Sequence, residues 1–366
     1  MINLYKPSIS FQCKKYVNEC LNSNWISSKG KFINLFENEF KKYTKIKYCT
    51  TVSNGTVGLH LALLALGIKS GDEIIVPTFT YIASVNCIKY VNAKPIFVDS
   101  DIHNCQIDLI KLKKLVNKNT KAMIIPHLYG GVIDLEQINK IREQFNLYIV
   151  EDCAEALGSF YKKKHVGNFG DVSVFSFFGS KTITTGEGGM VCSNSKKIAN
   201  EVIKLKGQGL KITADKPYYW HDRIGYNYRM TNICAAIGYS QIKIIDDILK
   251  KKREIFESYK KQLCQLPINF IKDSKYVKDS KWLVVIFLEN KSKKLFQFLK
   301  KKRIETRPTF NLASKMPMYG VKKKFPNAEE LSKRGLCLPS YPDLQLKQIK
   351  YICDSIKQFF KLQKVI

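Results

Sequence analysis

Lys181 lies in a turn of small and hydroxyl-bearing residues between two short apolar segments, VSVFSF (172–177) and GGMVCS (188–193). A lysine held in a tight, semi-buried turn loses hydration, and its amine becomes a usable nucleophile toward aldehydes. The chain contains 61 lysines and arginines, so a solvent-exposed surface lysine explains this residue equally well when it is taken alone. The turn therefore offers one candidate for imine chemistry. Other residues of the chain are needed to distinguish a reactive lysine from a surface lysine.

Asp152 ends the apolar segment LYIVED (147–152). An ionised carboxylate at the end of a strand can hold a metal ion, a sugar hydroxyl or a protonated ring nitrogen, and Asp152 alone does not distinguish these. The acidic stretch EDCAEA (151–156) stands out in a chain whose formal net charge is +30. We therefore expect Asp152 to have a cationic partner.

The residues Ser53-Asn54-Gly55-Thr56 precede the apolar stretch VGLHLALLALG (57–67). A small turn that opens a helix presents free backbone N–H groups at the positive end of the helix dipole, which suits a phosphate. Ser, Asn and Thr are also the usual N-cap residues, so an ordinary helix cap explains the same sequence. Both interpretations stay open from these residues alone.

Short apolar segments and amphipathic segments alternate along the first half of the chain, which is typical of an α/β protein with a largely parallel sheet and helices on both faces. Ligands of such sheets gather at the carboxyl ends of the strands, where Tyr81 and Asp152 lie. The predicted strands are 72–77, 94–99, 121–130 with its exit loop, 147–152, 172–177 and 188–193, and the predicted helices are 80–91, 108–118, 134–145 and one from about 195.

The last third of the chain predicts a smaller α+β domain. Residues 230–262 have the periodicity of one long helix that leads out of the large domain, and a strand at 282–288 and a helix at 295–302 follow. We place the large domain at 1–250 and the small domain at 251–366. The N-terminal segment 1–30 is expected to pack on the large domain, because Trp25, Ile26, Phe32 and Phe36 need burial.

Composition excludes several classes of function. The basic runs 250–253, 300–303 and 322–324 come without a nucleic-acid motif, so we interpret them as solvated surface and expect neither nucleic acid nor membrane as a partner. No apolar run reaches the roughly 20 residues of a membrane helix. The eleven cysteines form no CxxC and the five histidines no metal spacing, which predicts reduced thiols, no metal and a cytoplasmic protein.

Taken together, these segments resemble the sugar-nucleotide aminotransferases of the DegT family, which are pyridoxal-phosphate (PLP) enzymes of fold type I. The resemblance spans nearly the whole chain, and the order of its motifs is most similar to the perosamine synthases. It implies a large domain with a mostly parallel mixed sheet and a smaller C-terminal α+β domain. The matching segments are 25–40, 53–84, 94–101, 127–131, 149–159, 167–190 and 225–238.

The resemblance also implies one role for each matching position, around a cofactor bound at the interface of a homodimer. Lys181 would bind the cofactor aldehyde covalently and then carry protons, and Asp152 would pair with the pyridine nitrogen. The other implied contacts are Tyr81 on the ring face, Glu155 near the phenolic oxygen, Gly55, Thr56 and Ser176 on the phosphate, and Asn227 on the phosphate of the neighbouring subunit. Trp25, Ser27, Lys29 and Arg307 would bind substrate, and packing in the dimer is the alternative role for the segment 25–30.

The implied reaction moves an amino group from L-glutamate to C4 of a nucleotide-linked 4-keto-6-deoxyhexose, as in the formation of GDP-perosamine or dTDP-viosamine. Relatives usually continue ETRP with an aromatic loop containing proline and histidine, whereas this chain has ETRPTFNLAS (305–314). The nucleotide and the sugar configuration therefore stay open, and a 3-keto sugar or a UDP-4-keto N-acetylhexosamine is the alternative substrate.

Three competing functions are weighed against this expectation. Dehydratases of the same family replace the lysine with histidine, and a non-catalytic binding protein on the same fold would have lost Lys181 or Asp152. Both residues are present, which argues against these two classes. A nucleic-acid-binding protein is suggested by the charge alone.

Overall fold

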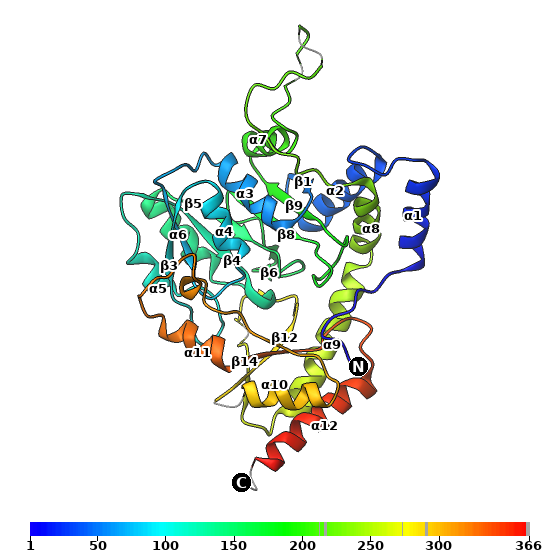
Figure 1. Ribbon diagram of the computed structural model, residues 1–366, viewed down its shortest axis with the longest axis vertical. Helices are drawn as coiled ribbons and strands as arrows, with labels where there is room; N and C mark the ends of the chain where they lie inside the picture. Colours follow the sequence, from blue (N-terminus) through cyan, green and yellow to red (C-terminus); the bar gives the residue numbers. More distant parts are fainter. Residues whose placement is uncertain (212, 216–217, 273, 290–291, 364–366) are drawn as a thin grey trace.

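The computed structural model describes residues 1–366 apart from 212, 216–217, 273, 290–291 and 364–366. Its centre is a seven-stranded sheet in the order β1-β9-β8-β5-β4-β2-β3 (Figure 1). Strands β8, β5, β4, β2 and β3 run parallel, and β9 runs antiparallel to both of its neighbours. The bounds are β1 (Tyr48–Val52), β2 (Glu73–Pro77), β3 (Lys94–Val98), β4 (Thr120–Pro126), β5 (Tyr148–Asp152), β8 (Val172–Ser176) and β9 (Gly189–Ser193). The predicted mixed, mostly parallel sheet is confirmed.

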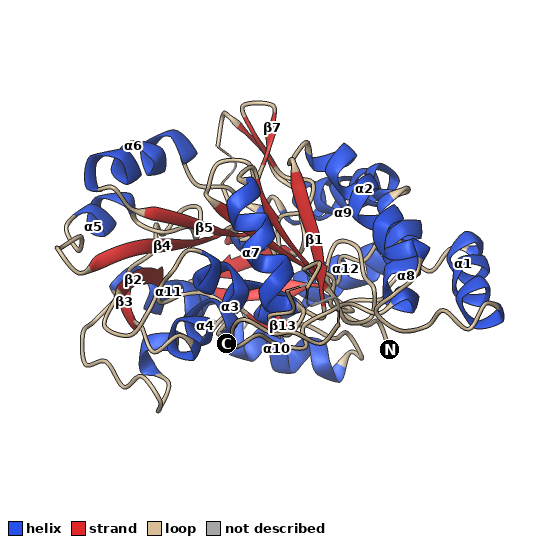
Figure 2. Cartoon of the chain, turned by 90° about the horizontal axis from the view of Figure 1, so that it is seen from above, coloured by secondary structure: helices blue, strands red, loops and turns tan. Residues whose placement is uncertain are grey.

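Helices cover both faces of this sheet (Figure 2). Successive strand residues point to opposite faces, so each strand contributes to two cores. In β5, Ile149 belongs to the core beneath α2, α6 and α8, and Val150 belongs to the core beneath α3 and α4. The bounds are α2 (Lys31–Thr44), α3 (Gly55–Ala65), α4 (Ala83–Tyr90), α5 (Leu109–Lys113), α6 (Leu135–Phe145), α7 (Lys196–Lys206) and α8 (Asn232–Ile242).

Two helices differ from the sequence prediction. The helix expected at 108–118 ends at Lys113, because Asn117 donates its backbone N–H to Thr120 Oγ1 (3.0 Å) and its amide to Glu73 Oε2 (2.8 Å). The single helix expected at 230–262 is two helices, α8 and α9 (Ile245–Leu263). α8 packs on α1 (Phe11–Asn22) and α2, whereas α9 packs on α12 (Leu346–Leu362). Because of the break, the two halves of this stretch pack in different parts of the molecule.

A second, antiparallel sheet has the order β10-β12-β14-β13, and helices α9, α10 and α12 share its core (Figure 1). A third, small sheet joins β11, β6 and β7. The bounds are β6 (Phe160–Tyr161), β7 (Lys164–His165), β10 (Ile268–Phe270), β11 (Val277–Lys278), β12 (Val284–Leu288), β13 (Arg307–Pro308), β14 (Gly335–Leu338), α10 (Ser292–Lys301), α11 (Pro326–Arg334) and α12 (Leu346–Leu362), with short 3-10 turns at Leu128–Gly130 and Ala313–Lys315.

The N-terminal residues pair with the C-terminal part of the chain. Ile2 forms a parallel bridge with Ile304, and the backbone N–H of Leu4 donates to Glu305 Oε2 (3.0 Å). Helix α1 (Phe11–Asn22) then packs on α8. The division at residue 250 stays a prediction, but these contacts tie the first residues to the smaller sheet.

The predicted burial of four large apolar residues near the N-terminus is confirmed for two of them. Phe32 and Phe36 are buried, as expected. Trp25 and Ile26 remain 56% and 47% exposed, so the prediction that they are buried is wrong for the single chain. Among the described residues, the helices include none that is long and apolar enough to cross a membrane.

Candidate active site

Asp152 and Ser176 lie at the carboxyl ends of the adjacent parallel strands β5 and β8. By the alternation of the strands they share the face covered by α3 and α4, because Val150 and Val174 belong to that core. Asp152 accepts hydrogen bonds from the Ser84 hydroxyl (2.6 Å to Oδ2) and from the Ala154 N–H (3.1 Å to Oδ1). The sequence analysis assigned no role to Ser84, although it is the last residue of the matching segment 53–84.

The neighbouring acid Glu151 points to the opposite face and has another environment. Its two oxygens accept hydrogen bonds from the N–H groups of Gly167, Phe169 and Gly170, at 2.7–2.8 Å, and Oε2 lies 3.0 Å from His127 Nε2. His127, Glu151 and Cys153 are the kind of set that could hold a metal ion. Here both carboxylate oxygens of Glu151 already accept hydrogen bonds from backbone N–H groups. Burial alone would raise the pKa of Glu151, but the hydrogen bonds from His127 and the backbone hold it below its usual value.

The start of α3 lies against Ser176 and forms a cradle of backbone. A Cβ on Gly55 would stand 2.9 Å from Ser176 Cβ, and a Cβ on Gly189 would stand 2.7 Å from the carbonyl carbon of Asn54. Asn54 is the N-cap, and its side chain accepts from Val57 N (3.0 Å). The structure thus brings together Gly55, Thr56 and Ser176, and the first-turn N–H groups of α3 lack intrahelical partners.

Lys181 extends from the turn after β8, and its side chain is 13% exposed. Its Nζ lies 3.7 Å from Glu155 Oε1 and 4.3 Å from the centroid of the Trp282 ring. Glu155 is buried, and its other oxygen accepts from Tyr129 N (2.9 Å). Burial raises the pKa of Glu155 to about 7, and the positive charge of Lys181 offsets part of that rise. Nothing in the sequence near Lys181 signals Trp282.

Tyr81 stands beside the loop that contains Arg307. Its side chain is 56% exposed, and its ring centroid lies 6.1 Å from that of Phe310. The same loop is joined to the end of β2 through Thr78 Oγ1, which donates to Ser314 Oγ (2.6 Å). Arg307 is exposed on β13, three residues before Phe310. The structure therefore places the 305–314 loop next to the predicted ring-stacking residue.

The remaining predicted residues are positioned elsewhere in the single chain. Trp25, Ser27 and Lys29 are exposed in the connection between α1 and α2. This connection is held by Asn232 of α8, which donates to the carbonyls of Trp25 (2.7 Å) and Ser27 (2.6 Å). Asn227 is exposed, forms an isolated bridge with Gly207 at the end of α7, and accepts from Arg229 Nη2 (3.1 Å).

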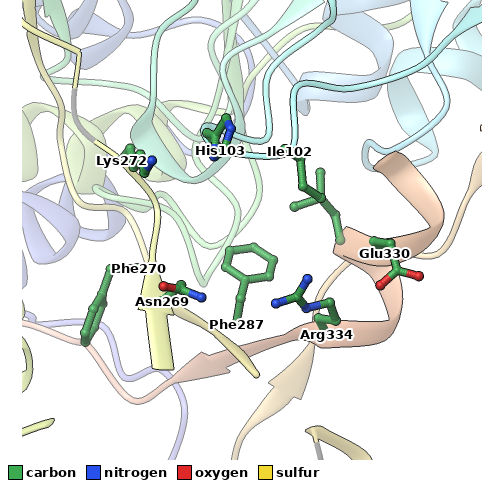
Figure 3. A pocket seen from close by; sticks show the side chains of 9 residues that line it. Ile102, His103, Asn269, Phe270, Lys272, Phe287, Glu330 and Arg334 are labelled. Atoms are coloured by element: carbon green, nitrogen blue, oxygen red, sulfur yellow. The ribbon is translucent and has the colours of Figure 1, made fainter. Parts of the chain in front are cut away.

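A separate cavity of about 300 Å³ lies between the loop after β3, the antiparallel sheet that contains β12, and α11 (Figure 3). Ile102 and His103 contribute to it from the loop after β3, Phe287 from β12 and Arg334 from α11. Its lining includes none of the residues predicted for the site, so it is distinct from the surroundings of Lys181.

The sequence pattern of the DegT/DnrJ/EryC1/StrS aminotransferase family matches residues 7–357. The chain belongs to this family. This aminotransferase is 53% identical to GDP-perosamine synthase of Escherichia coli O157:H7 over 362 residues, which are 98% of this chain and 98% of that relative. It is 47% identical to GDP-perosamine synthase of Vibrio cholerae, over 98% of this chain and 99% of that relative.

Solved structures agree with the family assignment. Helicobacter pylori PseC, an aminotransferase involved in the biosynthesis of pseudoaminic acid, matches with a TM-score of 0.92 at 26% identity, over 98% of this chain and 99% of PseC. A Streptococcus pneumoniae protein solved in its PMP and PLP forms matches with TM-scores of 0.93 and 0.91, both at 25% identity and over 98% of each chain. The aminotransferase uses pyridoxal 5′-phosphate, as the sequence analysis expected, and the predicted type I fold is confirmed.

Proposed function

We propose that this aminotransferase transfers an amino group from L-glutamate to C4 of GDP-4-keto-6-deoxymannose, giving GDP-perosamine. The observation that carries the proposal is the position of the Lys181 amine, 3.7 Å from the buried Glu155 carboxylate, in the turn after β8, which pairs with the strand that ends at Asp152. High identity to relatives named GDP-perosamine synthase supports the choice of nucleotide and sugar.

The residues around Lys181 fit the cofactor group by group. Gly55, Thr56 and Ser176 surround a backbone cradle that any Cβ would fill, which suits a phosphate at the start of a helix. We assign the pyridine nitrogen to Asp152, whose carboxylate is oriented by Ser84. We assign the exposed ring of Tyr81 to stacking on the cofactor.

In this assignment the bound cofactor supplies an electron sink for the carbon that loses its proton. Lys181 would hold the cofactor aldehyde, and its amine would move the proton once the amino donor has replaced it. Asp152 would hold a proton on the ring nitrogen through its negative charge. Burial raises the pKa of Glu155 to about 7, so both of its protonation states are accessible near neutral pH. The protonated carboxyl could donate a hydrogen bond to the phenolic oxygen of the cofactor, and the ionised carboxylate could accept one from the phenolic hydroxyl.

We assign the acceptor to exposed residues of two segments, the loop that contains Arg307 and the connection between α1 and α2. Arg307 can donate two parallel hydrogen bonds to a diphosphate, and the neighbouring Phe310 joins its loop to Tyr81. We assign Trp25, Ser27 and Lys29 to the sugar-nucleotide as well. The free state of all eleven cysteines is typical of a reducing compartment, and we propose the cytoplasm as the location.

The test is turnover with glutamate and cofactor on three acceptors offered in parallel: GDP-4-keto-6-deoxymannose, dTDP-4-keto-6-deoxyglucose and a UDP-4-keto N-acetylhexosamine. We expect amination of the GDP sugar at C4 and poor reaction of the other two, with products identified by mass spectrometry and NMR. Preferential turnover of the UDP sugar would instead support the alternative substrate named from the sequence, a UDP-4-keto N-acetylhexosamine. If none of the three reacts, the keto-sugar assignment is wrong.

We further propose a homodimer in which Asn227 reaches the cofactor phosphate of the partner. The support is the exposure of apolar side chains in two segments, α1 with its connection to α2, and the segment between α7 and α8. Phe11, Trp25 and Ile224 of these segments are 82%, 56% and 85% exposed. Single exposed apolar side chains are common on monomers, whereas a contiguous apolar patch marks an interaction surface, and the proposed dimer requires that these side chains belong to one.

A mixing experiment tests this shared site. Asn227→Ala is expected to lower turnover about ten-fold or more, because a hydrogen bond to a charged group contributes about 1.5–3 kcal/mol. Lys181→Ala is expected to be inactive on its own. Unfolding and refolding the two variants together should restore turnover, since each mixed dimer contains one site with both residues intact. No gain over the separately refolded variants would contradict the shared site.

A further inference from the structure

The main chain of the Lys181 turn is held by side chains from two distant parts of the sequence. Trp282 Nε1 donates to the carbonyl of Ser180 (2.8 Å), and the Tyr5 hydroxyl donates to the carbonyl of Lys181 itself. The Trp282 ring also faces the amine of Lys181, 4.3 Å from Nζ to the ring centroid. Neither donor belongs to the large sheet that carries Lys181.

A third side chain connects these two donors. Lys252 of α9 is fully buried, and its amine donates to the carbonyls of Trp282 (2.8 Å) and Ser340 (3.0 Å). The same amine lies 5.5 Å from the centroid of the Tyr5 ring. Its hydrogen-bond partners are carbonyl oxygens rather than carboxylates, and burial lowers the pKa of Lys252 to about 7. A buried lysine that joins two backbone segments costs desolvation energy, which points to a positional role.

Tyr5 is itself fixed by the smaller sheet. The N–H of its neighbour Leu4 donates to Glu305 Oε2 (3.0 Å), and the carbonyl of Leu4 accepts from Ser340 N (3.4 Å). Ser340 therefore contacts both the N-terminal segment and Lys252. The three side chains Tyr5, Trp282 and Lys252 form one connected unit, which we call the lysine clamp.

We propose that the lysine clamp positions the amine of Lys181 for its reaction with the cofactor. This inference rests on the proposed function, because it assumes that Lys181 is the residue that binds PLP. A lysine side chain has four rotatable carbon–carbon bonds, so its amine is placed only if the backbone is fixed and the tip has a defined neighbour. The clamp supplies both, through the carbonyls of Ser180 and Lys181 and through the Trp282 ring. The three residues are positioning residues, since they act through Lys181.

The test compares Tyr5→Phe and Trp282→Phe with a matched control, Tyr161→Phe. Tyr161 is a buried tyrosine of β6 whose hydroxyl donates to Asp134 Oδ1 (2.8 Å), and neither residue belongs to the lysine clamp. Each apo-protein is mixed with PLP, samples are reduced with borohydride at intervals, and the labelled lysine is identified by peptide mass spectrometry. Steady-state kcat and KM and the melting temperature are measured for the same variants.

For both clamp variants we expect labelling of Lys181 to slow about ten-fold and kcat to fall by a similar factor, with KM for both substrates within about two-fold, because small misplacements of a reacting group are costly. Tyr161→Phe should lower the melting temperature and change neither rate. Clamp variants that label and turn over like Tyr161→Phe would overturn the proposal. If the wild-type protein is not labelled at Lys181, the proposed function itself fails. Should Trp282→Phe not fold, Tyr5→Phe decides, since it removes a single oxygen atom.

Discussion

Replacing Lys181 with alanine is expected to lower the turnover number by about 10⁴-fold or more, the largest effect of any single substitution in this chain. A positioned acid–base group contributes about 10²–10⁴, and loss of the covalent link to the cofactor adds to this. The variant should still bind PLP, because the cradle around Gly55 and Ser176 and the carboxylate of Asp152 are untouched. Turnover and cofactor binding by equilibrium dialysis are the measurements.

Lys206→Ala is the matched control for this experiment. Its side chain is 14% exposed, against 13% for Lys181, and its amine donates to the carbonyl of Thr51 (2.8 Å) in the same part of the molecule. We expect the control to turn over within a few-fold of the wild-type rate. Near-wild-type turnover by Lys181→Ala would show that another residue performs the chemistry.

Asp152→Asn is expected to lower turnover by roughly 10²–10³-fold. Breaking a buried charge pair by removing one partner costs about 3–5 kcal/mol, and the neutral amide leaves the protonated ring nitrogen without its counter-charge. The substitution preserves the size of the side chain, so the melting temperature of the apo-protein should change much less than the activity. The measurements are kcat and the half-life for release of the cofactor, which should shorten.

Asp171→Asn controls for the loss of a carboxylate at the other end of β8. Asp171 pairs with Arg142 (2.6 Å) and is 12% exposed, so its loss should affect stability and leave the half-life of the bound cofactor unchanged. Ser84→Ala removes only the hydroxyl that orients Asp152, so it should lower kcat by less than Asp152→Asn does. An Asp152→Asn variant within ten-fold of the wild-type kcat would contradict its assignment to the ring nitrogen.

The sheet and much of the site could be predicted because local patterns report them. The short apolar runs in 147–152 and 172–177 indicate both the strands and their carboxyl ends, and adjacent parallel strands bring those ends together. The capping sequence at Asn54 likewise indicates the start of α3. What these runs alone do not tell is which of two neighbouring acids faces the site. The structure separates Asp152 from Glu151 by their partners, a serine hydroxyl for one and backbone N–H groups for the other.

The lysine clamp could not be predicted because its contacts join residues far apart in the sequence. Lys252 belongs to the basic run 250–253, for which the sequence predicts solvated surface, and it is fully buried. The interpretation is correct for Lys250 and Lys251, which are exposed. In α9 the apolar face that packs on the smaller sheet also includes the position of Lys252, and two carbonyl groups there replace water around its amine.

The pairing of Ile2 with Ile304 also bears on how the protein is made. Ribosomes add about 5–20 residues per second, so the N-terminal segment waits roughly 15–60 s before its partner leaves the exit tunnel. Until then Tyr5 has no anchor, and the Lys181 turn lacks one of its donors. The large sheet can form during translation, whereas full competence to capture the cofactor comes only after release of the late segments. Nascent chains that stall early are therefore expected to be folded in part and to react with PLP more slowly than the full-length chain.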